Sequence, residues 1–221
     1  MIKFQVIFLS LLMNKIIVGI LIKSNDYDEF VLKKGNLNHL YSKCTIILIP
    51  VFDNYDRLDL DALKICDMII IPGGSVIYPY YYEVIDYALV NHIPLLGICL
   101  GMQALGLYST TKDELDLLKV DNHYLENNKK HEIIILPNTI LNKLFLNKIK
   151  VNSRHHYILK EVEYPFIVSA YSKDGTIEAI EYSKDDNLMI GVQFHPEDLD
   201  NMSILYDYFI AYIIKKKLKE H

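Results

Sequence analysis

The sequence predicts an α/β fold, in which an open, mostly parallel sheet with helices on both faces is joined by an antiparallel, β-rich C-terminal half. Short apolar runs rich in Ile, Val and Leu recur through the first half, as KIIVGILI, TIILIP, MIIIPGG and IPLLGIC. The segments between them are long enough for crossover helices, and continuously apolar runs are typical of parallel strands covered on both faces. In the second half, the turn signals KDG and KDDN separate apolar runs and indicate hairpins.

Each element follows from these patterns. The first half has predicted strands within residues 15–22, 45–50, 68–74 and 93–99. Apolar residues at helical spacing predict a helix over 78–92 and a second one over 100–109. The polar stretch 108–130 predicts surface structure, and strands are expected within 131–137, 149–159, 166–183 and 188–197. The amphipathic stretch 202–219 predicts a final helix whose last turn is basic, as the helix dipole prefers.

The chain of 221 residues, about half of them apolar, is expected to form a single domain over residues 13–221. The first 22 residues are apolar, but Lys3, Gln5, Asn14 and Lys15 interrupt them and leave too short a core to span a bilayer. A signal-like segment is the alternative to a strand here, although no small-residue cleavage site follows. Met13 is a second candidate start, so residues 1–12 are expected to be a dispensable extension.

The net charge and the cysteines indicate which partners and which cellular compartment to expect. The formal net charge of −5, with both signs interspersed, argues against nucleic acid as a partner. Three irregularly spaced cysteines form neither a disulfide framework nor a metal-ligand pair, which favours a reducing, cytoplasmic location. The histidines and carboxylates show no metal-ligand spacing either, so the sequence predicts no metal and no cofactor.

A single cysteine stands between two glycines where a predicted strand meets a predicted helix. The stretch GICLG places Cys99 between Gly97 and Gly101, which is the thiol form of a nucleophile elbow. At a helix N-terminus, unpaired backbone amides and the positive end of the dipole favour a thiolate and can stabilise an oxyanion. The alternative is a buried, inert cysteine, which is the expectation for Cys44 and Cys66.

A candidate base lies near the other end of the chain, in GVQFHPE. Residues two apart in an extended segment share a side, and Pro196 biases the preceding His195 toward extended geometry. Glu197 is therefore expected to reach the His195 imidazole and orient it as a general base. A structural turn is the alternative for His-Pro-Glu alone.

A third piece is the strand that ends in Gly73 and Gly74. Glycines at the carboxyl edge of the sheet expose backbone amides and let the backbone approach a substrate carbonyl. An ordinary strand-ending turn is the alternative.

Together and in this order, IPGG, GICLGMQ and GVQFHPE resemble the class I glutamine amidotransferase superfamily, over most of the chain. The resemblance implies its flavodoxin-like fold, a Cys99–His195–Glu197 triad and a γ-glutamyl thioester intermediate. It also implies an oxyanion hole from Gly74 and the Leu100 amide, and Gln103 as a residue that helps to hold the glutamyl group, next to the Gly73 backbone.

Two further segments, VNSRHHYI and DGTIEAIE, resemble the γ-glutamyl hydrolase branch, particularly its γ-glutamyl-γ-aminobutyrate hydrolase-like members. In that branch, His155 and His156 are candidates to bind a substrate carboxylate, although a packed imidazole at a strand end is the alternative. The chain departs from the branch at Leu100, where Arg is usual, at Tyr157, where Gln is usual, and after the cysteine helix, where Gly-Gly-Thr is missing. These are places where substrate selectivity would be set.

Three functions remain open at this point. The leading one is a free-standing cysteine hydrolase that cleaves γ-glutamyl amides and has a small-molecule substrate and no membrane partner. The runner-up is a glutaminase subunit that supplies ammonia to a synthase, because GICLGMQ with Leu100 also resembles such subunits. The third is a catalytically silent binding module on the same fold. The oligomeric state, such as a homodimer, is not set by the sequence.

Overall fold

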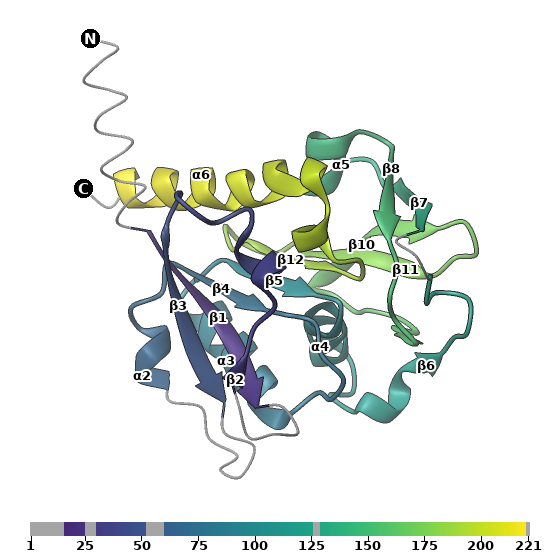
Figure 1. Cartoon of the computed structure of the whole chain (residues 1–221), viewed down its shortest axis with the longest axis horizontal. Helices are drawn as coiled ribbons and strands as arrows, with labels where there is room; N and C mark the ends of the chain where they lie inside the picture. Colours follow the sequence, from purple (N-terminus) through teal and green to yellow (C-terminus); the bar gives the residue numbers. More distant parts are fainter. Residues whose placement is uncertain (1–15, 25–29, 52–59, 126–128, 220–221) are drawn as a thin grey trace.

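A ten-stranded mixed sheet runs through the molecule (Figure 1). The computed structural model describes residues 16–24, 30–51, 60–125 and 129–219. The parallel half contains β1 (Ile17–Ser24), β3 (Thr45–Val51), β4 (Met68–Ile71), β5 (Leu95–Ile98) and β12 (Met189–Val192). Its strands lie in the order β3-β1-β4-β5-β12. The predicted parallel sheet is therefore confirmed.

The antiparallel half continues the same sheet from β12. Its strands are β11 (Ile177–Tyr182), β10 (Phe166–Ser172), β7 (Lys130–Ile135) and β8 (Lys148–Asn152), in that spatial order. The hairpins expected from KDG and KDDN join β10 to β11 and β11 to β12. Short strands complete the set: β2 (Phe30–Val31) pairs with β1, and β6 (Leu118–Lys119) pairs with β9 (Tyr157–Ile158) in a separate two-stranded sheet.

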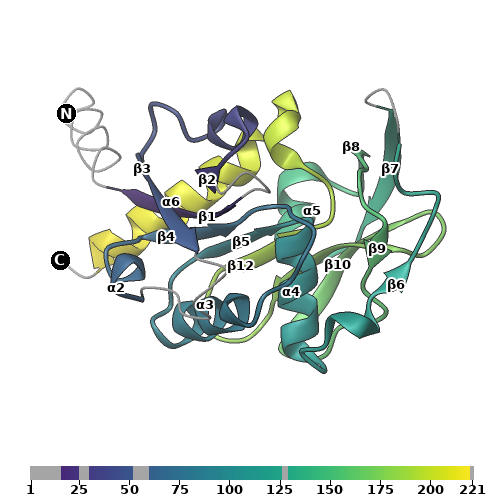
Figure 2. The ribbon, with the colours of Figure 1, turned by 60° about the horizontal axis from the view of Figure 1, so that its bottom comes forward.

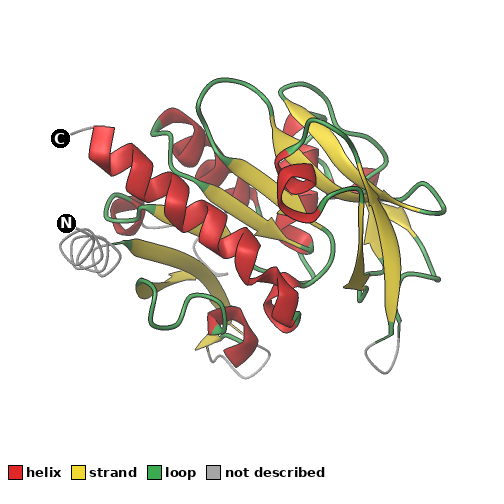
Figure 3. Ribbon diagram, turned by 90° about the horizontal axis from the view of Figure 1, so that it is seen from above, coloured by secondary structure: helices red, strands yellow, loops and turns green. Residues whose placement is uncertain are grey.

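Helices cover both faces of the sheet (Figures 2 and 3). On one face lie α2 (Leu60–Leu63), α3 (Pro79–Val90) and α4 (Leu100–Ser109), and on the other lie α5 (Ile140–Phe145) and α6 (Ser203–Lys219). The sequence of β4 is apolar throughout because both faces of the strand are covered. Ile69 and Ile71 pack on the side of α3 and α4, whereas Met68 and Ile70 pack on the side of α6. A strand buried on both faces has no polar side.

Several elements were not predicted, namely β2, α2, α5 and the 3-10 turns η1 (Lys34–Leu37), η2 (Glu114–Asp116), η3 (Pro196–Asp198) and η4 (Asp200–Met202). Within the polar stretch, residues 110–125 form η2, β6 and mostly exposed turns, as expected for surface structure, although His123 is buried. No helix in the described ranges is long and apolar enough to cross a membrane. The expected extension, residues 1–12, lies outside the described residues.

Candidate active site

The three sequence motifs meet at the carboxyl edge of the parallel strands. Gly73 and Gly74 follow β4, Cys99 follows β5, and His195 follows β12 by three residues. Because β4, β5 and β12 are neighbours in the sheet, segments more than a hundred residues apart in sequence lie side by side. This edge is where open α/β sheets bind their ligands.

Cys99 occupies a strained turn between β5 and α4. Its backbone has φ 51° and ψ −100°, a combination that L-residues rarely adopt. The glycine frame is required by close packing: a Cβ at Gly101 would lie 2.2 Å from the carbonyl oxygen of Ile71, and one at Gly97 would lie 2.6 Å from the Gly101 backbone. The turn therefore brings α4 directly against β4 and β5, with Cys99 at its start.

His195 and Glu197 form a buried pair. His195 Nδ1 donates to Glu197 Oε1 at 2.7 Å, and the Glu197 side chain is 4% exposed. The His195 backbone is extended, as predicted from Pro196, while Glu197 itself lies in η3. Burial alone would lower the pKa of the imidazole, but hydrogen bonds to Cys99 and Glu197 outweigh it and raise the pKa to about 9. His195 therefore holds its proton at neutral pH.

Gly73 packs against this pair. A Cβ at position 73 would lie 2.8 Å from His195 Cε1 and 3.5 Å from Cys99 Cβ. Gly74 and Leu100 line the cavity into which Cys99 opens. As the first residue of α4, Leu100 carries an amide with no partner within the helix, which makes it available to an oxyanion.

Asn152 fixes the backbone of His195, a role that sequence reasoning missed. Its Nδ2 donates to the His195 carbonyl and its Oδ1 accepts from the His195 amide, both at 2.8 Å. Asn152 is the last residue of β8, so it connects the far edge of the antiparallel half to the histidine. Asn152 lies in the segment VNSRHHYI, which the sequence analysis singled out. Its partner His195 is 43 residues away, so no local pattern identifies this pair.

A pair of glutamines flanks the cysteine. Gln193 Nε2 donates to Cys99 Sγ at 3.5 Å, and sequence reasoning did not single out this residue. The amide of Gln103 donates to the Tyr157 carbonyl at 2.7 Å and to Gln193 Oε1 at 3.2 Å. The amide nitrogen of Gln103 is therefore already hydrogen-bonded within the protein, which leaves Oε1 as the atom that can contact a ligand.

Cys99 opens into a cavity of about 380 Å³. The sequence-predicted binding residues Gln103, His155 and His156 all line it. Burial, and next the neighbouring His123, lower the pKa of His155 to about 3, so this imidazole is neutral. His156 is exposed and stacks on Tyr124, with ring centroids 4.7 Å apart. Both histidines follow the end of β8 at Asn152 and lie in the loop before β9.

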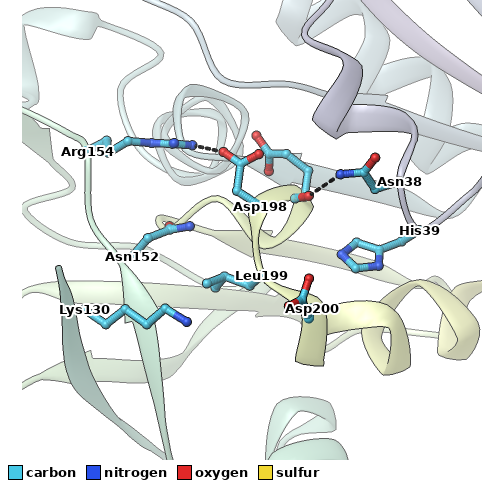
Figure 4. Close-up of a pocket in the computed structure, with 9 residues that line it drawn as sticks. Asn38, His39, Lys130, Asn152, Arg154, Asp198, Leu199 and Asp200 are labelled. Atoms are coloured by element: carbon cyan, nitrogen blue, oxygen red, sulfur yellow. Dashed lines mark hydrogen bonds and ion pairs between the residues drawn. The ribbon is translucent and has the colours of Figure 1, made fainter. Parts of the chain in front are cut away.

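The back of the His195–Glu197 segment borders a second, larger hollow of about 960 Å³ (Figure 4). Arg154 pairs with Asp198 across it at 2.5 Å, while Asn38 donates to the Glu197 carbonyl and His39 lies 3.1 Å from the Pro196 carbonyl oxygen. These contacts hold η3 in place.

Of the other two cysteines, Cys66 is buried as expected, whereas Cys44 is only half-buried against the core. Cys44 and Cys66 donate to the carbonyls of Leu40 and Ala62, one helical turn earlier. Burial raises the pKa of each thiol to about 11, so both are protonated at neutral pH. Neither lines the cavity that contains Cys99.

Known proteins share this architecture. The chain aligns over 90% of its length with the glutaminase domain of Trypanosoma brucei CTPS with bound acivicin, covering 94% of that structure with a TM-score of 0.68 and 18% identity. At that identity the match shows the fold, which is the predicted glutamine amidotransferase fold.

Sequence comparison identifies relatives and a family. "Protein NtpR" of Enterococcus hirae is 30% identical over 65% of this chain and 74% of its own length. "Putative glutamine amidotransferase PB2B2.05" of Schizosaccharomyces pombe is 31% identical over 87% of this chain and 83% of its own length. The Peptidase C26 family model matches residues 82–197, which include the cysteine turn and the His-Pro-Glu segment. The chain belongs to the Peptidase C26 family.

Proposed function

We propose that this protein is a cysteine hydrolase of γ-glutamyl amide bonds that uses Cys99, His195 and Glu197. The family and the amidotransferase relative support the broader class, a hydrolase or amidotransferase. The observation that carries the finer proposal is the contact of a protonated, Glu197-oriented His195 with a cysteine at the start of a helix. That combination is the activated form of a thiol nucleophile.

The reaction follows from these groups. The Cys99 thiolate attacks the γ-carbonyl carbon, and the amides of Gly74 and Leu100 stabilise the resulting oxyanion. His195 then donates its proton to the amide nitrogen, the C–N bond breaks, and the amine leaves a γ-glutamyl thioester on Cys99. Neutral His195 next takes a proton from water, whose oxygen attacks the thioester. Collapse releases glutamate and restores the thiolate and the protonated imidazole.

The cavity offers two kinds of surface to a γ-glutamyl compound. Oε1 of Gln103 is suited to the amino group of the glutamyl part, and Arg154, which borders this cavity as well as pairing with Asp198, is suited to its carboxylate. The cavity also has an apolar part, formed by Val76, Ile77, Leu115 and Leu117 beside the Glu114 carboxylate. An apolar wall suits a leaving amine that carries a carbon chain, such as γ-aminobutyrate, better than ammonia.

The test is glutamate release by the purified chain from glutamine, γ-glutamyl-γ-aminobutyrate and γ-glutamyl peptides, with Cys99→Ala as the control. We expect release that the substitution abolishes, with γ-glutamyl-γ-aminobutyrate preferred to glutamine. Failure of the folded protein to release glutamate from all three would refute the free-standing hydrolase.

A second candidate is a glutaminase subunit that supplies ammonia to a synthase partner. It is favoured by the likeness to a CTPS glutaminase domain and by Leu100 after the nucleophile. This function predicts little glutamine hydrolysis by the chain alone and a rise in hydrolysis when the partner is added. Full activity with γ-glutamyl-γ-aminobutyrate in the absence of any partner would exclude it.

A further inference from the structure

Beside the active-site cavity, ionisable side chains from four separate segments converge in the interior. His123 lies in the turn after β6, His131 on β7, His155 in the loop after β8, and Glu178 on β11. Glu178 is completely buried, and His123 and His155 are each 3% exposed. One nitrogen of each of these two histidines and a Glu178 oxygen all lie within 4.8 Å of one another. Hydrolysis at Cys99, as proposed, uses none of these nitrogens.

The separations around Glu178 Oε1 suit a shared ion. This oxygen lies 3.5 Å from His123 Nδ1, 3.3 Å from His131 Nε2 and 3.9 Å from His155 Nε2. Zinc–ligand bonds of about 2.0–2.2 Å place the ligands of a tetrahedral site about 3.3–3.6 Å from one another. The distances to His123 and His131 match the edges of such a tetrahedron, and the distance to His155 is about 0.3 Å longer than that range. All three are longer than a good N–H···O hydrogen bond.

The atoms that face the centre of this cluster have no hydrogen-bond partner among the described residues. They are His123 Nδ1, His131 Nε2, His155 Nε2 and both carboxylate oxygens of Glu178. Buried polar groups without partners are costly and therefore rare in native proteins. A cation at the centre of the cluster would satisfy the three nitrogens and at least one oxygen together.

In His123 and His155, the ring nitrogen that does not face Glu178 is hydrogen-bonded in the way that is usual for metal-bound histidines. His123 Nε2 lies 2.8 Å from Asp174 Oδ2, and His155 Nδ1 lies 3.1 Å from the Tyr157 carbonyl oxygen. If each of these nitrogens carries the proton that it donates, the lone pairs of His123 Nδ1 and His155 Nε2 are left toward Glu178. Metal-bound histidines are oriented by carboxylates and carbonyls in this way.

We propose that His123, His155 and Glu178 bind a divalent transition-metal ion, zinc, with His131 as the fourth ligand. Imidazole and carboxylate ligands suit zinc, and four protein ligands make a closed, structural site. The ion would fasten the loops that carry His123 and His155 to strands β7 and β11. Because His155 also lines the cavity that contains Cys99, the site would stabilise one wall of the active site.

The test measures metal content and stability on the full chain, purified without a histidine tag. We expect one zinc per chain by elemental analysis. A chelator should lower the thermal unfolding midpoint, and added zinc should restore it. The variant Asp174→Asn keeps all four ligands but loses the carboxylate on His123, and should weaken zinc binding about 10- to 100-fold in competition with a chromophoric chelator.

The matched controls separate this site from adventitious binding. His92→Asn, at an exposed histidine between α3 and β5, should retain wild-type zinc content and affinity. Glu178→Gln is isosteric and should lose stoichiometric zinc. The proposal is overturned if the folded wild-type protein binds zinc no more tightly than Glu178→Gln, or if chelator and zinc leave its unfolding midpoint unchanged. In those cases the cluster is an ion pair between His123 and Glu178 without a metal.

Discussion

The side chain of Asn152 is hydrogen-bonded to both the amide and the carbonyl of His195, each at 2.8 Å. These two bonds fix the backbone from which the imidazole projects toward Cys99. The second anchor of the imidazole is Glu197, which holds Nδ1. The position of the proposed base therefore depends on one residue beside it in sequence and on one from a distant strand.

Asn152→Ala is expected to reduce kcat about 100-fold with little change in KM, because a displacement of about 1 Å in a reacting group can cost that much. It should also lower the free energy of unfolding by about 1–3 kcal/mol, since it leaves the His195 amide unpaired, whereas the His195 carbonyl still accepts from the Asp198 amide at 3.3 Å. Steady-state kinetics and denaturant unfolding measure the two effects. Unchanged kcat in a variant that is destabilised would show that Asn152 acts on stability alone.

The pH dependence of kcat/KM should show an upper limb near pH 9. His195 is protonated below its raised pKa of about 9 and can donate to the leaving amine, and above it this proton is lost. Glu197→Gln removes the carboxylate charge that helps to raise this pKa, so the upper limb should move to lower pH. An upper limb at the same pH in the variant would contradict the assignment of this limb to His195.

Alkylation should be selective for one of the three cysteines. With pKa values of about 11, Cys44 and Cys66 are thiolates only to about 1 part in 10,000 at pH 7. We expect limited iodoacetamide to label Cys99 first and to abolish glutamate release in parallel. Peptide mapping by mass spectrometry identifies the site, and labelling of Cys66 at an equal rate would argue against an activated Cys99.

Gly73→Ala and Gly175→Ala should affect different properties, the first activity and the second stability. A methyl group at position 73 meets His195 Cε1 at 2.8 Å, so we expect it to displace the imidazole and reduce kcat about 10- to 100-fold. At Gly175 nothing lies within 4 Å, but φ is +88°, so Ala there should cost about 1–2 kcal/mol of stability and leave kcat unchanged. Equal kcat values in the two variants would contradict the proposed role of Gly73.

Much of the fold could be predicted from local patterns. The apolar runs that became β1, β4 and β5 have no polar face, and the glycines around Cys99 mark a turn where a helix packs directly on its strand. Helix α5 was missed although Thr139 caps its start, because the helix is short and Glu181 from β11 accepts its first two amides at 2.7 and 2.9 Å. The sequence around α5 gives no indication of this contact with Glu181.

In the candidate site, too, residues that belong to local motifs could be predicted, and residues that depend on distant partners could not. Cys99, His195 and Glu197 could be singled out because each belongs to a compact motif with its own turn chemistry. Asn152, Gln193 and the ligands around Glu178 could not, because each matters through a partner that is distant in sequence. The histidines of that cluster have no metal-ligand spacing along the chain. The pairing of β7, β8, β10 and β11 brings His131, His155 and Glu178 together, and hydrogen bonds from Ser153 and His155 to the His123 carbonyl add His123.

The place of β12 in the sheet affects how the protein is made. Among the described residues it is the last strand in sequence, yet it lies between β5 and β11 and links the parallel and antiparallel halves. During synthesis, the Cys99 turn leaves the ribosome about a hundred residues before His195 does. The nascent chain therefore carries its thiol without its base, and the sheet cannot close around Cys99 until β12 has been synthesised.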